Sequence, residues 1–287
     1  MGISWQAIYV LWLREMKGMW RAKSRVVGAL GMPIFFLAFL GLGFGQASIP
    51  GIPAGVSYVE FLTPGIIGMT MLFSSMFAGI SVLWDKEFGF LKEVMVAPVS
   101  RLSIVLGRVA GGSTVSVLQG CLILTLSSLM MGFRVRGSAG GVAPVPVSLL
   151  LALIFMCLIS VTFIGLGLIF ASRMRDMQGF SLVVNFVMFP IFLLSGALFP
   201  VESLPAWLVP LCYANPLTYG VDGLRGVLLG GLGGLGGLGG LGGLGGAGAG
   251  VGVAEFPVLL DLLLTAASSV GMVSVGSYLF ESTEVER

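Results

Sequence analysis

The chain has 287 residues, of which 56% are hydrophobic and only 10% charged, and its mean hydropathy of +1.04 lies outside the range of soluble domains. It has no histidine, which excludes Ser-His-Asp and Cys-His catalytic groups and ordinary histidine metal sites. Neither GxxxxGKS nor GxxxxGKT occurs, so any ATP hydrolysis must come from another chain and we expect no enzyme activity here. The composition indicates an integral membrane protein.

The first 25 residues combine aromatic and basic side chains at helical spacing. Trp5, Trp12 and Trp20 recur along this segment, with Arg14 and Lys17 between them. Tryptophan and basic residues favour the boundary between a membrane and water. Residues 1–25 are therefore predicted to form an amphipathic helix in the cytoplasmic interface, with a loose solvated tail as the alternative.

Six apolar runs follow, each long enough to cross a bilayer core of roughly 30 Å as a helix of about 20 residues. Gly45-Gln46-Ala47, after the first run, resembles a signal-peptidase site, but so many residues precede that run that we expect it to stay as an anchor. The expected fold is an all-α polytopic membrane protein with a six-span domain over residues 26–287. The predicted spans are 26–45, 62–84, 109–132, 148–171, 179–199 and 258–280.

Lysine and arginine are distributed unevenly between the two sides that six spans define. Of the 15 basic residues, only Arg134, Arg136 and Arg225 fall in the loops near 46–61, 133–147 and 200–257. The others fall in residues 1–25, 85–108, 172–178 and 281–287. Because basic loops are retained in the cytoplasm, we expect both termini and the 84–108 loop to be cytoplasmic, in a multi-pass protein of the plasma membrane.

The stretch WDKEFGFLKEVMVAPVSR, residues 84–101, lies between the second and third spans. Phe88, Leu91 and Met95 recur at helical spacing, which predicts one apolar stripe on a short amphipathic helix that ends at Pro98. Such a helix could lie on lipid headgroups or dock its apolar side chains into a groove of a soluble partner. Periodicity alone leaves both interpretations open.

The predicted external segment 200–257 contains too many prolines for a spanning helix. We expect short interfacial or re-entrant helices here, anchored by Trp207, Tyr213 and Tyr219. The glycine–leucine tract at 230–246 is an alternative seventh span. Its glycines and its three-residue period disfavour a helix, so we interpret it as a low-complexity external insertion.

Polar residues inside the spans are candidate pathway positions because hydrocarbon penalises them. Most are hydroxyls, which we interpret as helix-packing groups. Gln119 and Asn185 are better pathway candidates, although helix packing would also explain them, and Asp261 is interpreted as a boundary residue. The inventory is Ser74, Ser75, Thr114, Ser116, Gln119, Ser160, Thr162, Asn185, Ser195 and Asp261.

Small residues within the spans predict packing between helices. The cysteines Cys121, Cys157 and Cys212 are far apart and odd in number, so they indicate neither a disulfide framework nor a metal site. Close approach of helices is expected where glycines recur, at Gly107, Gly111, Gly165 and Gly167.

Several segments match a known family in the order in which they occur. They are FLTPGIIGM at 61–69, WDKEFGFLKEVMVAPVSRLSIVLGR at 84–108, FPIFLLSGALFP at 189–200, LPAWL at 204–208 and NPLTYGVDGLR at 215–225. The ordered set resembles the permease subunit of the ABC-2 family of ATP-binding-cassette transporters, especially its daunorubicin-exporter-like branch. The glycine–leucine tract departs from the family pattern.

The resemblance implies an exporter of drugs, lipids or polysaccharides, in a family associated with multidrug resistance. It implies two copies of a separate ATPase subunit, which would bind ATP and Mg²⁺, and a second permease chain, identical or different; no cofactor in this chain and no nucleic acid are expected. The segment after the second span would act as a coupling helix. Its ATPase-contact residues would be Phe88, Gly89, Phe90, Leu91, Lys92 and Glu93, with Pro98 and Arg101 fixing the return to the third span.

Two other functions remain open at this stage. A membrane scaffold or assembly protein would use residues 84–101 only to coat headgroups. An ion-coupled secondary carrier would need intramembrane charges as relays, and the spans contain few.

Overall fold

The computed structural model describes residues 4–45, 52, 55–87, 100–135, 144–174, 176–230, 254 and 256–285. In these residues all regular secondary structure is helical, which confirms the prediction of an all-α fold. The long helices are α2 (Lys23–Phe44), α3 (Tyr58–Glu87), α5 (Arg101–Met131), α6 (Val145–Arg173) and α10 (Val258–Val285). The shorter ones are α1 (Trp5–Arg21), α7 (Met177–Leu193), η1 (Val201–Ser203), α8 (Val209–Ala214) and α9 (Pro216–Leu229).

The long helices are apolar enough to cross a membrane. Candidate spans of at least 18 residues are present in five described helices, at Val27–Phe44, Tyr58–Gly79, Leu102–Met131, Val145–Arg173 and Val258–Phe280. They coincide with five of the six predicted spans. The remaining one corresponds to α7, an apolar helix of 17 residues, so the count of six stays a prediction.

Two predicted boundaries are wrong. The fifth span was expected to continue to residue 199, but α7 ends at Leu193 and turns follow. Pro190 cannot donate a backbone hydrogen bond, and Gly196 has a φ of +69°, which reverses the chain direction. The third span was expected to begin at 109, but α5 begins at Arg101, where Ser100 caps it by accepting a hydrogen bond from the Ser103 amide at 3.3 Å.

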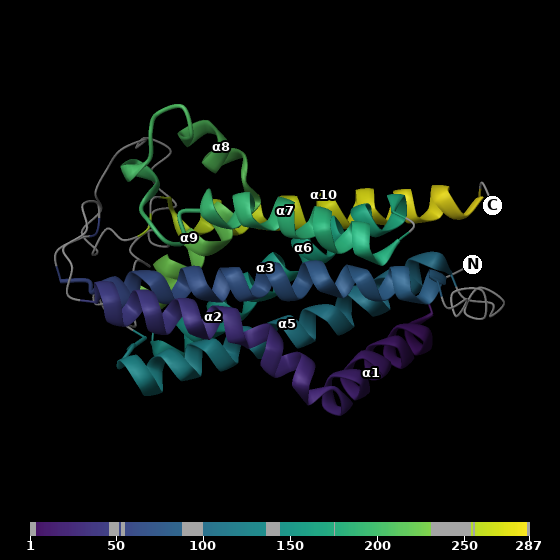
Figure 1. Ribbon diagram of the computed structural model, residues 1–287, viewed down its shortest axis with the longest axis horizontal. Helices are drawn as coiled ribbons and strands as arrows, with labels where there is room; N and C mark the ends of the chain where they lie inside the picture. The colour runs from purple at the N-terminus through teal and green to yellow at the C-terminus, as the bar shows by residue number, and fades with distance from the viewer. Residues whose placement is uncertain are drawn as a thin grey trace.

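The helices lie side by side along the long axis of the molecule (Figure 1), and both ends of the chain lie at the same end of this bundle. α8 and α9 lie at the opposite end. α3 is central and packs against α2, α5, α6 and α9, while α10 packs along α6. Leu62, Ile66 and Met69 of α3 are fully buried, so this helix forms the middle of the core.

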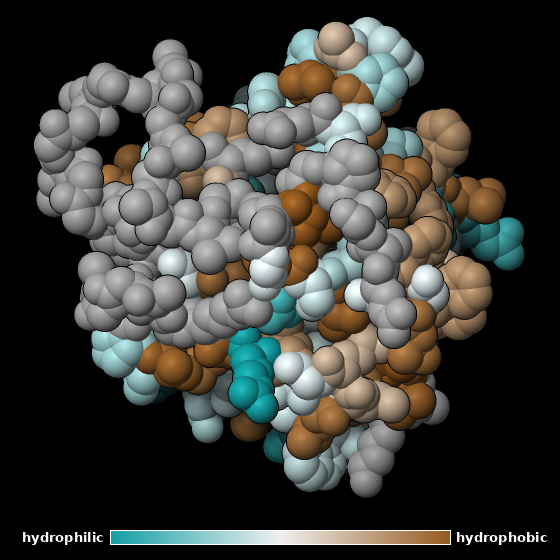
Figure 2. All heavy atoms as spheres, turned by 90° about the vertical axis from the view of Figure 1, so that its left-hand side faces the viewer, coloured by the Kyte–Doolittle hydropathy of each residue, from teal (hydrophilic) through white to brown (hydrophobic). Residues whose placement is uncertain are grey.

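The outer helices expose large apolar side chains. Phe39 of α2, Phe186 of α7 and Leu263 of α10 are 64%, 81% and 61% exposed. Figure 2 views the molecule from the end at which α8 lies; brown hydrophobic side chains cover much of the coloured surface, and teal hydrophilic ones form small groups. Apolar surface of this extent is compatible with lipid rather than water as the surrounding solvent.

Glycines let the central helices approach closely, as predicted. A Cβ at Gly167 of α6 would lie 2.9 Å from the Met76 carbonyl oxygen of α3, and one at Gly165 would lie 2.7 Å from the Met272 backbone of α10. At Gly107 and Gly111 of α5 a Cβ would lie 2.9 and 2.7 Å from side-chain atoms of Leu11 and Glu15 of α1. At Gly165 and Gly167 the neighbour is backbone and leaves no room for a side chain, so glycine is required there on packing grounds.

Candidate functional site

The predicted ATPase-contact segment lies between two described helices. Phe88, Gly89, Phe90, Leu91, Lys92, Glu93 and Pro98 fall outside the described residues, so their role stays a prediction. α3 leads into this segment and ends at Glu87, and α5 leaves it at Arg101. The two helices pack against each other, so the C-terminal end of α3 and the N-terminal end of α5 define the base of the segment.

α1 packs on the first turns of α5, next to this base. The indole Nε1 of Trp12 donates to Thr114 Oγ1 at 3.0 Å, and the amide of Ser4 donates to Ser103 Oγ at 2.9 Å. A Cβ at Gly107 would lie 2.9 Å from the Cβ of Leu11. The predicted helix is therefore present, with one face packed on protein. Its place in the membrane interface stays a prediction, with Trp5 and Trp20 at 78% and 74% exposure on the outer side.

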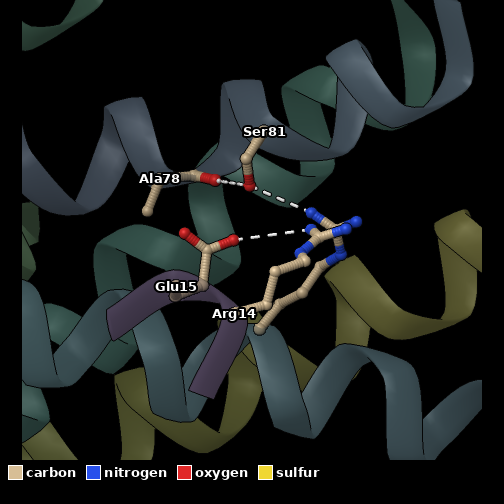
Figure 3. Close-up of polar contacts among 5 residues, drawn as sticks. Arg14, Glu15, Ala78 and Ser81 are labelled. Carbon is tan, nitrogen blue, oxygen red and sulfur yellow. Dashed lines mark hydrogen bonds and ion pairs between the residues drawn. The ribbon is translucent and has the colours of Figure 1, made fainter. Parts of the chain in front are cut away.

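Arg108 is a residue whose role the sequence analysis missed. It was placed in the cytoplasmic loop, but it lies near the start of α5 and is only 6% exposed. Its Nη1 donates to Ser81 Oγ of α3 at 3.0 Å, at the junction that Figure 3 shows in close-up. A signal was present, since Arg108 stands between Gly107 and Gly111, where a second helix can come close.

Hydroxyl groups join three helices inside the bundle. Ser75 Oγ of α3 lies 3.1 Å from Ser116 Oγ of α5 and 3.0 Å from Ser160 Oγ of α6. Ser116 Oγ in turn donates to Ser74 Oγ at 2.9 Å. A hydroxyl donates one hydrogen and accepts others, so these four groups can satisfy one another. The arrangement supports the interpretation of these serines as helix-packing groups.

Gln119 and Asn185 lie on different helices, and no hydrogen bond joins them in the described structure. Gln119 is 3% exposed on α5, and its Oε1 accepts no hydrogen bond from the described residues. Asn185 of α7 is half-buried, and its Nδ2 donates to the Ser181 carbonyl of its own helix at 2.8 Å. Whether either lines a pathway stays a prediction.

The short helices expected in the external segment are present, and one of them is buried. Arg225 of α9 is 4% exposed; its Nη2 donates to the Gly196 carbonyl at 3.0 Å, and its guanidinium lies 3.7 Å above the Phe61 ring of α3. Its Nη1 lies 3.9 Å from Asp222 Oδ1, and Asp222 Oδ2 accepts from the Phe256 amide at 2.9 Å. These contacts hold α9 inside the bundle. The sequence analysis had treated Arg225 only as an external charge.

Asp261 lies in the first turn of α10, near the end of the last span, as the boundary interpretation required. It is nevertheless fully buried, which that interpretation did not anticipate. Burial raises the pKa of the neighbouring Tyr219 phenol, and the Asp261 carboxylate raises it further. The end of the bundle at which α8 and α9 lie therefore combines buried acidic and basic groups on α9 and α10.

The described residues contain no group of three or more histidine, cysteine or acidic side chains that could hold a metal ion. Cys121, Cys157 and Cys212 form no disulfide bond in the described structure. The structure instead has two packed assemblies at its ends. At one end α1, α3 and α5 form a common base, and at the other the short, charged helix α9 is buried.

Comparison with known proteins identifies the family. The model of the ABC-2 type transporter family matches residues 6–229. The chain is 31% identical over 222 residues to ycf38 of Pyropia yezoensis, covering 77% of this chain and 73% of that protein. It is also similar to the inner membrane transport permease YadH of Escherichia coli K12 (27% identity; 80% and 86% covered) and to nodulation protein J of Rhizobium leguminosarum bv. trifolii (29%; 79% and 80%). This chain is a multi-pass membrane permease and belongs to the ABC-2 type transporter family.

Proposed function

We propose that this chain is the transmembrane permease subunit of an ATP-driven exporter in the plasma membrane. The observation that supports this best is the family match over residues 6–229 in a sequence that has no nucleotide-binding motif of its own. A permease of this kind needs an ATPase as a partner chain. We infer two ATPase copies and a second permease chain, by analogy with the family.

The coupling segment would be residues 84–101, held between α3 and α5. Force from a soluble subunit reaches the spans only if the segment is attached to rigid elements, and two long helices packed on each other meet that requirement. Phe88, Gly89, Phe90, Leu91, Lys92 and Glu93 would contact the ATPase, and Pro98 and Arg101 would fix the return to α5. We infer that this end of the bundle, with both termini, is cytoplasmic because most basic residues lie on that side.

The cargo we propose is amphiphilic, such as a drug, a lipid or a polysaccharide-type molecule. The spans present hydroxyl and amide groups. Among them, the buried Oε1 of Gln119 accepts no hydrogen bond from the described residues. Groups of this type suit a cargo with both apolar and hydrogen-bonding parts. They do not form the carboxylate relay that an ion-coupled carrier would need.

The test is co-purification of an ATPase with the tagged permease from native membranes in mild detergent, identified by mass spectrometry. Replacing both Phe90 and Leu91 by glutamate puts two charges on the proposed docking face, and we expect the recovered ATPase to fall by about tenfold or more, because buried unpaired charges disrupt an interface. Cargo export should fall in parallel.

Trp207→Glu is the matched control. Trp207 is 72% exposed and lies two residues before α8, the helix that Figure 1 shows at the opposite end of the bundle, so this charge should leave ATPase recovery unchanged. If the double variant retained the ATPase and exported normally, the coupling assignment would be wrong. If the unaltered protein recovered no ATPase in several detergents, the scaffold function would be the better explanation.

A further inference from the structure

Arg108 is a buried cation at the meeting point of three helices. Its Nη1 donates to Ser81 Oγ of α3 at 3.0 Å, and Ser81 Oγ donates its own hydrogen to the Ala78 carbonyl at 2.8 Å. Because a hydroxyl has a single hydrogen, the Ser81 oxygen is oriented to accept from Arg108. The bond therefore joins α5 to one defined turn of α3.

α1 forms the third side of this junction. Arg14 and Glu15 of α1 pair with each other here, since Arg14 Nη2 lies 3.6 Å from Glu15 Oε1. Figure 3 shows these two side chains extending from α1 toward the turn of α3 that contains Ala78 and Ser81. The Glu15 stem also lies against Gly111, where a Cβ would be 2.7 Å from its Cγ. Gly111 lies three residues after Arg108, on the same face of α5.

The hydrogen bond between Arg108 and Ser81 lies close to the ends of the two helices that it joins. Ser81 lies six residues before the end of α3 at Glu87, and Arg108 lies seven residues after the start of α5 at Arg101. At about 3.6 residues per turn, both are within about two turns of the segment between the helices. Arg108 thus ties together the two helices from which the 88–99 segment extends.

Charge makes the junction resistant to opening. A guanidinium in a site this buried is costly unless acceptors and opposite charge stay close to it. The hydroxyl that accepts from Arg108, Ser81, belongs to α3, and the Glu15 side chain that packs on Gly111 belongs to α1. Moving α3 away from α5 therefore removes the acceptor of Arg108, and moving α1 away breaks the packing beside it.

We propose that Arg108 is a positioning residue that makes the cytoplasmic ends of α1, α3 and α5 move as one body. This inference rests on the proposed function, in which an ATPase displaces residues 84–101. With the ends held together, that displacement shifts the spans instead of opening the gap between α3 and α5. Without Arg108, the ends would separate and ATP hydrolysis would continue without transport.

The first measurement is amide hydrogen exchange of the full chain in lipid nanodiscs without an ATPase. Arg108→Met removes the charge and the donors while keeping an extended side chain. We expect exchange in residues 78–87 and 101–111 to rise by about tenfold, because the bond that protects these helix ends is lost. Arg108→Lys, which keeps the charge, should lie between Arg108→Met and the unaltered chain. Arg173→Met is the control, since Arg173 is exposed in the last turn of α6.

The second measurement is cargo transported per ATP hydrolysed by the complete complex. Arg108→Met should lower this ratio by about tenfold while hydrolysis persists, whereas a purely structural defect would lower both rates together. If Arg108→Met does not fold, Ser81→Ala removes only the acceptor hydroxyl and should move both readouts in the same direction by a smaller amount. Unchanged exchange, or an unchanged ratio in a folded variant, would overturn the proposal.

The two proposals fail in different ways. If the unaltered chain neither binds nor stimulates an ATPase, the proposed function is wrong and the coupling role falls with it. The exchange data would still decide whether Arg108 holds α1, α3 and α5 together.

Discussion

The two ends of the bundle each contain a buried arginine, and the two are stabilised differently. Arg225, at the end with α8 and α9, has the carboxylate of Asp222 three residues away in the same helix. Arg108, at the opposite end, donates to the Ser81 hydroxyl of another helix. Arg225 therefore keeps its counter-charge wherever α9 goes, whereas Arg108 keeps this acceptor only while α3 and α5 stay together.

The contacts of Arg225 with Asp222 lie within one helix and stabilise that helix alone. The contact of Arg108 with Ser81 joins two helices and depends on how these helices are placed relative to each other. A pair within one helix makes that helix tolerable in an apolar interior. A pair distributed over several helices makes their relative position matter. The first suits a short helix that must remain buried, and the second suits the base of the proposed coupling segment.

The largest expected effect comes from removing the buried arginine of α9. Arg225→Met takes away the positive charge beside Asp222, the donor to Gly196 and the group stacked on Phe61. We expect the free energy of unfolding to fall by about 3–5 kcal/mol, as when one partner of a buried pair is deleted. The measurement is denaturation in mixed micelles of SDS and mild detergent, followed by tryptophan fluorescence.

The double variant Asp222→Asn/Arg225→Met sharpens this prediction. Once Asp222 is neutral, no buried negative charge is left unpaired when Arg225 is removed. The double variant should therefore lose less free energy of unfolding than the sum of the losses in the two single variants. Strict additivity would mean that the two side chains do not act as a pair, and the contrast with Arg108 would lose its basis.

An intermediate effect is expected where α3 packs on α6, two residues before Ser81. A Cβ at Gly79 would lie 2.7 Å from the Gly167 carbonyl carbon, so Gly79→Ala must push two backbones apart. We expect a loss of about 1–3 kcal/mol, the usual cost of overpacking, in the same micelle denaturation. Gly271→Ala is the matched control, because nothing lies within 4 Å of that Cβ position and alanine is the better helix former. Equal effects at both sites would show that α3 is not held tightly at this end.

The smallest expected effect concerns the attachment of α1. Trp12→Phe keeps the aromatic ring but removes the Nε1 donor to Thr114. We expect a loss of about 0.5–1.5 kcal/mol, the net value of one hydrogen bond, together with faster amide exchange in α1. Trp5→Phe should change neither, since Trp5 is 78% exposed. If the two variants behaved alike, α1 would be attached by something other than the contact at Trp12, and the three-helix junction would need revision.

Hydropathy and charge predicted most of the fold, because both are properties summed over many side chains. The helical class, the approximate positions of five spans, the short helices after α7 and the close approaches at Gly165 and Gly167 all followed from composition and spacing. The end of α7 was missed because Pro190 and Gly196 act on one turn, an effect that a span-length average hides. The start of α5 was missed because the helix, capped by Ser100, begins at Arg101, eight residues before the uncharged run at 109.

By itself, the sequence determined that this is an all-helical membrane permease of a recognisable family, since apolar run length, basic-residue distribution and motif order need no knowledge of contacts. Tertiary structure alone decided which side chains meet. Ser75 and Ser160 are 85 residues apart in the chain, yet their Oγ atoms lie 3.0 Å apart. Arg108 and Ser81 are 27 residues apart, yet Nη1 of the arginine lies 3.0 Å from Oγ of the serine. Such pairs depend on which faces of the helices turn toward one another. That choice is made by packing the whole bundle together, so no local pattern in the chain contains it.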